Sequence, residues 1–200
     1  MPDIDVNTQG KTLLAIARAA IAREFGVALA TRNESRGDEN PCARDAEWLQ
    51  QPGATFVTLL RNGELRGCIG SLEARLPLRD DIEANARAAA FADPRFAPLT
   101  VSELNETDIE VSLLSPLQPM TFADEADALA QLRPGRDGVV FEYGAHRSTF
   151  LPQVWEQLPQ TREFIGHLKA KAGLPVHFWS DKVRLFRYGV SKWKEQDFKD

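Results

Sequence analysis

The 200-residue chain lacks the features that mark membrane, secreted and nucleotide-binding proteins. No apolar run approaches the roughly 20 residues that span a bilayer, and Met1-Pro2-Asp3-Ile4-Asp5 has neither the basic nor the apolar region of a signal peptide. A Gly-rich phosphate loop, a dinucleotide-binding fingerprint and a serine elbow are also absent. We therefore expect a cytoplasmic protein with no membrane segment and no bound cofactor.

Cysteine and histidine are scarce, with two and three residues respectively. Cys42 lies in a polar stretch and Cys68 in a β-prone one, so a structural disulfide is not expected in the cytosol. No two of these cysteine and histidine residues fall at a usual zinc spacing, which argues against a metal site.

Basic residues are outnumbered, since 24 Lys and Arg face 29 Asp and Glu, for a net charge of −5 and a pI near 5.3. A nucleic-acid binder needs a clustered excess of Lys and Arg, so this class is disfavoured. The length and the 43% apolar content predict one domain over residues 1–200. We expect a main lobe of about 10–118 plus 181–195 and a smaller lobe of about 119–180.

The stretch Leu65-Arg66-Gly67-Cys68-Ile69-Gly70 joins a thiol, a cation and two glycines inside a predicted strand. Asn62-Gly63 precedes it and is the strongest short hairpin signal, which predicts a 55–70 hairpin with a two-residue loop. An undisturbed register would pair Leu59 with Arg66 and Val57 with Cys68. The predicted core face then holds Phe56, Leu60, Leu65 and Ile69, and the other face holds Arg66, Cys68 and Gly70.

The remaining pattern predicts an α+β fold. Helices are expected at 11–25, 77–92, 122–132 and 161–172, with a short one capped by Thr100 and Glu103, and strands at 108–114, 139–143, 146–151 and 183–193. The polar stretch 26–53 is predicted to be a long surface loop. We expect an antiparallel sheet of the 55–70 hairpin and the 108–114 and C-terminal strands, covered by the first two helices, with a second, smaller α+β lobe.

Cys68 is the candidate catalytic nucleophile. A thiolate is intrinsically reactive, and Arg66 on the same predicted face would favour it. The structural alternative is a buried cysteine that behaves as a small hydrophobe. None of the three histidines is brought to Cys68 by the sequence.

A candidate site for a small anion surrounds this thiol. Arg66 and Arg95, with Arg136 and Arg147, are the side chains that could grip a carboxylate or phosphate. Glu110 and Ser112 share one face of their strand and could complete a polar pocket with Arg66 and Cys68, while Gly67 and Gly70 would leave room beside the backbone. A structural salt bridge between Arg66 and Glu110 is the alternative.

Four motifs in order give the chain a family resemblance: the hexapeptide at 65–70, Phe91-Ala92-Asp93-Pro94-Arg95-Phe96, the strand segment 110–116 and Thr149-Phe150-Leu151-Pro152-Gln153-Val154-Trp155. Over residues 10–192 the sequence resembles the AMMECR domain family, and among prokaryotic members the A component of the AmmeMemoRadiSam group. The resemblance implies a fold and a neighbourhood that includes a Memo-like protein and a radical SAM protein, while the family's activity is unsettled. Two functions stay open: a small-ligand-binding protein or Cys-dependent enzyme acting with these partners, or a non-catalytic adaptor that docks them.

Overall fold

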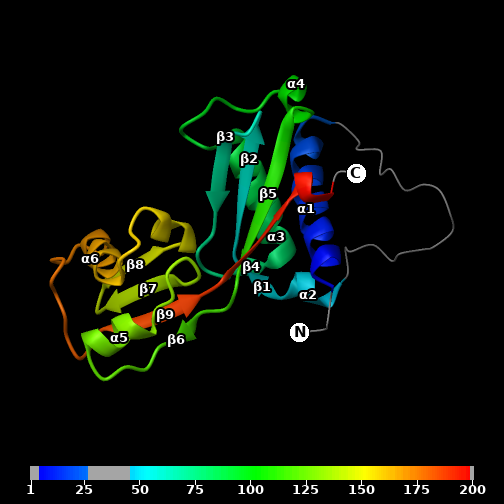
Figure 1. Ribbon diagram of the computed structural model, residues 1–200. Coiled ribbons are helices and arrows are strands. Elements are labelled where there is room, and N and C mark those ends of the chain that lie inside the picture. Colours follow the sequence, from blue (N-terminus) through cyan, green and yellow to red (C-terminus); the bar gives the residue numbers. More distant parts are fainter. Residues whose placement is uncertain (1–4, 27–45, 199–200) are drawn as a thin grey trace. The chain divides into compact units, whose positions relative to one another are not determined.

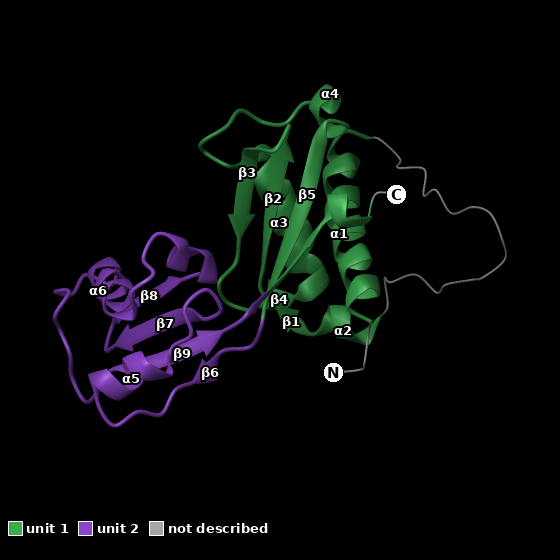
Figure 2. Ribbon diagram, viewed as in Figure 1, with its two compact units in different colours: residues 1–114, 191–200 green, residues 115–190 purple. Residues whose placement is uncertain are grey.

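A computed structural model describes residues 5–26 and 46–198 of the chain. The chain divides into two compact units, one of residues 1–114 and 191–200 and one of residues 115–190 (Figure 2). Cys42 and most of the predicted surface loop lie outside the described residues. In the described ranges, no helix combines the length and the apolar character that crossing a membrane requires.

The first unit is a four-stranded sheet with two long helices on one face, as Figure 1 shows. Its strands lie in the order β10-β5-β2-β3, and β2 pairs antiparallel with both of its neighbours. The α+β prediction is therefore confirmed. The elements of this unit are α1 (Val6–Glu24), α2 (Glu47–Gln50), β1 (Pro52–Gly53), β2 (Thr55–Arg61), β3 (Glu64–Gly70), β4 (Leu76–Pro77), α3 (Leu78–Phe91), α4 (Val101–Leu104), β5 (Thr107–Leu114), β10 (Val190–Lys194) and a final 3-10 turn (Glu195–Phe198).

Helix α1 begins at Val6, five residues before the predicted Lys11. The Asp5 side chain caps it by accepting from the backbone N–H of Thr8 at 2.9 Å. Gly10 lies inside the helix, where the Trp193 ring occupies the place of a side chain: a Cβ there would come within 2.2 Å of the ring. The predicted end at Gly26 is confirmed by its left-handed φ of 66°.

The β2–β3 hairpin has the predicted loop but not the predicted register. Asn62 and Gly63 both have positive φ, as a type I′ turn requires. A β-bulge then leaves Arg66 as an extra residue, so that Leu59 pairs with Gly67 instead of Arg66. Beyond the bulge every pair shifts by one residue, and Thr58 rather than Val57 faces Cys68.

The shift also corrects the predicted core face of β2. Val57 and Leu59 are fully buried under the helices, whereas Phe56 and Leu60 point to the opposite face and Leu65 is exposed. Ile69 does pack against the core, as predicted. We call the side of the sheet opposite α1 and α3 the outer face.

A buried polar cluster joins α3 to the start of β2. Asn85, which the sequence placed on the inward side of the helix, donates to the backbone carbonyl of Thr55 at 3.1 Å. Asp81 accepts from the Thr55 N–H at 2.8 Å and from its hydroxyl at 2.7 Å. These bonds compensate the desolvation of three polar side chains and fix the height of the helix along the sheet.

The predicted C-terminal strand, 183–193, is wrong as a single element. It is two strands in two sheets: β9 (Arg184–Tyr188) belongs to the second unit, and β10 pairs with β5 in the first. The break falls at Gly189, where Ser115 donates its N–H to the Gly189 carbonyl and accepts from the Gly189 N–H.

The second unit contains β6 (Gln118–Pro119), α5 (Glu125–Gln131), β7 (Gly138–Tyr143), β8 (His146–Phe150), a 3-10 helix (Pro152–Glu156), α6 (Thr161–Lys171) and β9, with the sheet order β6-β9-β7-β8. The predicted strands 139–143 and 146–151 pair antiparallel as β7 and β8, and Glu142 faces Arg147. Lys169, in the last turn of α6, is 1% exposed and binds Glu125 Oε1 at 2.7 Å.

The corrected register predicts which of two adjacent leucines carries stability. We expect Leu59→Ala to lower the free energy of unfolding by about 2–5 kcal/mol, because it removes a fully buried side chain. Leu60→Ala, on the outer face, is the matched control and should cost clearly less. Urea unfolding of both variants measures this, and equal midpoints would contradict the register described above.

Candidate functional site at the edge of β3

Cys68 lies on β3, the last strand of the sheet, with its backbone groups directed to the free edge. Its N–H donates to Asp93 Oδ2 at 2.8 Å, and its carbonyl accepts from Arg95 Nη2 at 3.2 Å. A single Asp–Arg pair thus replaces the N–H and C=O that a neighbouring strand would offer. We call this arrangement the edge clamp, and it fixes the backbone of Cys68 on both sides.

The edge clamp depends on a strong ion pair within the segment 93–95. Arg95 donates to Asp93 through Nε at 2.9 Å and Nη2 at 2.7 Å. Asp93 is only 4% exposed. The hydrogen bonds from Arg95, and then those from the Cys68 and Arg95 N–H groups, outweigh burial and hold the pKa of the Asp93 carboxyl well below its usual range. The same carboxylate raises the pKa of Arg95.

Asp93 is the contact that sequence reasoning missed. It lies in the motif that carries the family resemblance, but it is not among the predicted site residues. The available signal was a carboxylate two residues before an arginine, directly after α3. Arg95, in contrast, was among the predicted ligand-binding residues, and the structure brings it to Cys68.

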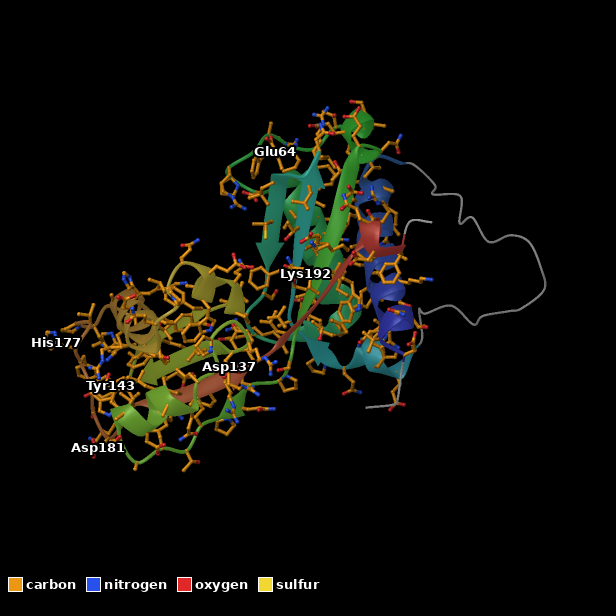
Figure 3. The ribbon with its side chains drawn as sticks, viewed as in Figure 1. Glu64, Asp137, Tyr143, His177, Asp181 and Lys192 are labelled. Carbon is orange, nitrogen blue, oxygen red and sulfur yellow. The ribbon has the colours of Figure 1, made fainter. Side chains whose placement is uncertain are left out.

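The sulfur of Cys68 points to the outer face, next to polar side chains of three other strands. Thr58, its direct partner on β2, donates its hydroxyl to Sγ at 3.2 Å. Thr58 in turn faces Glu110 on β5, whose carboxylate binds Lys192 Nζ at 2.9 Å and Lys194 Nζ at 3.3 Å. We call these five residues the outer row; Lys192 is labelled in Figure 3. Cys68 and Glu110 therefore share a face, as predicted.

Arg66 is not part of the outer row. Its Nε and Nη2 bind the two oxygens of Glu103 at 3.0 and 3.2 Å. These bonds, before the contribution of Thr100, lower the pKa of the Glu103 carboxyl to about 2. Arg66 Nη1 is the buried side-chain atom without a hydrogen-bond partner in the described part of the chain. The predicted Arg66–Glu110 salt bridge is thus wrong.

The two glycines of the motif allow other parts of the chain to approach β3 closely. A Cβ on Gly67 would lie 2.1 Å from the carbonyl oxygen of Ala89, so Gly67 lets α3 approach β3. A Cβ on Gly70 would lie 2.3 Å from the Phe56 ring. The premise that these glycines leave space for a ligand is therefore wrong, although the expected close approach of another backbone is confirmed for Gly67.

The other predicted residues divide between the units. Ser112 faces Phe56 on β2 and lies two residues from Glu110 on the outer face. Arg136 and Arg147 belong to the second unit, as do His146, His167 and His177. Among residues 5–26 and 46–198, no group of three metal-binding side chains is placed to hold an ion.

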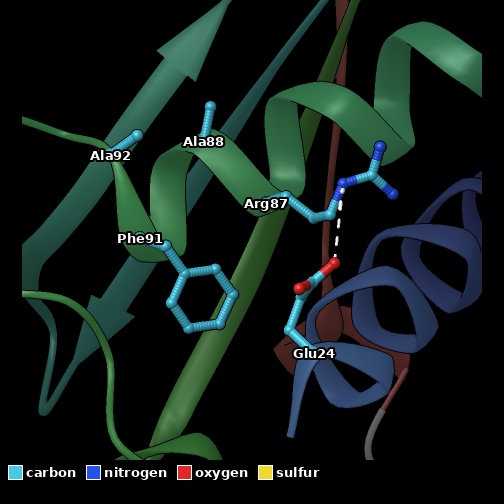
Figure 4. A pocket seen from close by; sticks show the side chains of 5 residues that line it. All are labelled: Glu24, Arg87, Ala88, Phe91 and Ala92. Atoms are coloured by element: carbon cyan, nitrogen blue, oxygen red, sulfur yellow. Dashed lines mark ion pairs between the residues drawn. The ribbon is translucent and has the colours of Figure 1, made fainter.

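A shallow hollow of about 420 Å³ lies on the helical side of the first unit, between α1 and α3 (Figure 4). Glu24, Arg87, Ala88, Phe91 and Ala92 line it, and Glu24 and Arg87 form a long ion pair at 3.9 Å. The side chain of Cys68 points to the opposite face of the sheet. We therefore base the candidate site on the outer row and the edge clamp rather than on this hollow.

Comparisons with known proteins agree over almost the whole chain. The AMMECR1 family model matches residues 14–193. A protein of Methanothermobacter thermautotrophicus is 37% identical over 193 residues, which is 94% of either chain. A protein of Saccharolobus islandicus is 36% identical over 91% of this chain and 79% of its own length. The crystal structure of the uncharacterised protein PH0010 from Pyrococcus horikoshii is similar with a TM-score of 0.71 and 27% identity, over 92% of this chain and 90% of that one.

The lowered pKa values of the Asp93 and Glu103 carboxyls predict how stability depends on pH. Both carboxyls have a lower pKa in the folded chain than in the unfolded one, so their ionised forms stabilise the fold above the ordinary value of about 4. This contribution should be lost as the pH falls from about 5 to about 2. Asp93→Asn should flatten that part of the curve, as measured by urea unfolding at each pH.

Glu106→Gln is the control for this measurement, because Glu106 is an exposed partner of Arg61. Its curve should keep the slope of the parent protein. An Asp93→Asn curve as steep as the parent's would show that the edge clamp makes no charge-dependent contribution to folding.

Proposed function

The chain belongs to the AMMECR1 family, and on that premise we propose that it binds a small ligand through the thiol of Cys68. The observation that carries the proposal is the fixation of this one residue. Its N–H, carbonyl and sulfur are each held by a different side chain, at 2.8, 3.2 and 3.2 Å. A binding group that is ordered before the ligand arrives loses less entropy on binding.

A hydrogen-bond donor and a cation lie beside this thiol. Thr58 donates its hydroxyl to the sulfur at 3.2 Å. Arg95, whose side chain is 52% exposed, binds the carbonyl of the same residue. A ligand with an acceptor or a negative charge could therefore meet both groups next to the sulfur.

These contacts fit a thiol that works without a histidine of its own unit. All three histidines of the sequence lie in residues 115–190, whereas Cys68 belongs to the first unit. In the proposed role Cys68 is a direct ligand contact or a nucleophile activated by Thr58 and Arg95. Whether the ligand is also converted distinguishes a Cys-dependent enzyme from a carrier.

Thiol labelling tests the proposal. In a Cys42→Ser background, where Cys68 is the single cysteine, we expect neutral alkylating reagents to modify Cys68 of the native protein faster than free cysteine at neutral pH. Thr58→Val should slow the reaction about three- to tenfold, the effect of losing one hydrogen bond. Mass spectrometry of the purified native protein should find a small molecule that is lost in Cys68→Ser.

Ser112→Ala is the matched control for Thr58→Val, since it removes another hydroxyl of the outer face that does not contact the sulfur. It should leave the rate unchanged. A Cys68 that stays unlabelled while the protein is folded would refute the proposed role of the thiol.

A second candidate is an adaptor that docks a protein, and exposed leucines favour it. Leu65, the second residue of β3, is 43% exposed, and Leu76 is 46% exposed just before α3. They pair with Leu60 and Gly53 respectively, so they are two separate apolar positions at which a partner could make contact. The partners implied by the family resemblance are a Memo-like protein and a radical SAM protein.

Binding measurements with these two purified partners test the adaptor function. If either one binds, Leu65→Glu together with Leu76→Glu should weaken the complex about tenfold or more, since buried apolar anchors dominate binding energy. Val101→Glu, at another exposed position on α4, should have little effect. Equal affinities for the parent and the double variant would rule out a docking role for these two leucines.

A further inference from the structure

Two lysines are held on the outer face by a single carboxylate. Glu110 is 6% exposed, and its two oxygens bind Lys192 and Lys194 separately. A surface lysine usually samples many rotamers, but these ammonium groups are fixed by a buried acid. Two positive charges therefore lie next to one negative charge on the outer face, which the two long helices do not cover.

Two ammonium groups bind one carboxylate, so this part of the outer face carries more positive than negative charge. Asp108 is the other acid on this face of β5, and its Oδ2 accepts from Gln196 at 2.7 Å. Since Gln196 contacts position 108 while both lysines contact position 110, Lys192 is the lysine more distant from Asp108. It binds Glu110 Oε2 at 2.9 Å, and its side chain is 44% exposed.

Strand spacing gives the distance from this cation to the thiol. The order β10-β5-β2-β3 puts two strands between Lys192 and Cys68. With about 4.8 Å between neighbouring strands, their backbones are roughly 14 Å apart, and the Lys192 side chain leans back to Glu110 on β5. A ligand in contact with both would have to extend across β2.

From this geometry we infer that Lys192 binds an anionic group of an elongated small ligand whose other end contacts Cys68. The inference rests on the proposed function and names the chemical class of its ligand. Lys192 takes the role that the sequence suggested for Arg66, because the Arg66 side chain is 14% exposed and binds both oxygens of Glu103, whereas the Lys192 side chain is 44% exposed. Arg95 is held by Asp93 and stays with the edge clamp.

Two disulfide reagents that differ in charge test the inference. The dianion 5,5′-dithiobis(2-nitrobenzoate) carries a carboxylate on each half, and 4,4′-dithiodipyridine is neutral. With either, the Cys68 thiolate attacks one sulfur, a mixed disulfide forms, and the other half leaves as a thiolate. The ratio of the two rate constants, measured in a Cys42→Ser background, reports attraction of the anion independently of the reactivity of the thiol.

Lys192→Gln should lower this ratio about threefold or more, and Lys192→Arg should restore it. Lys11→Gln, on α1 at the other face of the sheet, is the control and should leave the ratio unchanged. Raising the ionic strength from about 0.01 to about 1 M should remove the difference between the parent and Lys192→Gln.

The anion site at Lys192 and the proposed role of Cys68 can be disproved separately. An unchanged ratio in Lys192→Gln, with fast reaction of both reagents, overturns the anion site and leaves the proposed role of Cys68 intact. Slow reaction of both reagents with the folded parent protein overturns the proposed function, and the inference with it.

Discussion

The ion pair between Asp93 and Arg95 is the interaction on which the site depends, because it completes the hydrogen bonding of an edge strand without adding another strand. An uncovered edge presents free N–H and C=O groups that invite pairing with other chains. Here a carboxylate and a guanidinium satisfy these groups at Cys68. The edge stays closed at that residue, and the thiol side chain stays free to point to the outer face.

The bulge at Arg66 decides which side chains the site contains. Without it, Leu59 would pair with Arg66, and the cation and the thiol of the motif would share one face. The extra residue instead directs Arg66 to Glu103, and it leaves Cys68 beside Thr58. The residues of the motif are neighbours in the sequence but have different roles in the structure. Arg66 and the two glycines stabilise the packing of the first unit, and Cys68 faces outward.

The two faces of the sheet have different roles, and charged residues lie on the outer one. The apolar side chains that the sheet adds to the core lie on the opposite face, where Val57, Leu59 and Ile69 pack under the helices. The cost of burying Glu110 is offset by two ammonium groups. Binding chemistry on this face can thus vary without disturbing the core, which is compatible with either a ligand or a protein partner.

The sequence by itself determined the features that depend on neighbouring residues: the turn at Asn62-Gly63, the helix over 78–91 and the capping box at Thr100. Positive φ, helical periodicity and capping are local properties, so single-chain patterns reveal them. Only the tertiary structure decided the bulge at Arg66, the division of the C-terminal strand at Gly189 and the charge partners of each arginine and lysine. These depend on contacts between segments distant in sequence, such as Lys192 with Glu110, and a one-residue shift in pairing reverses the face of every side chain that follows.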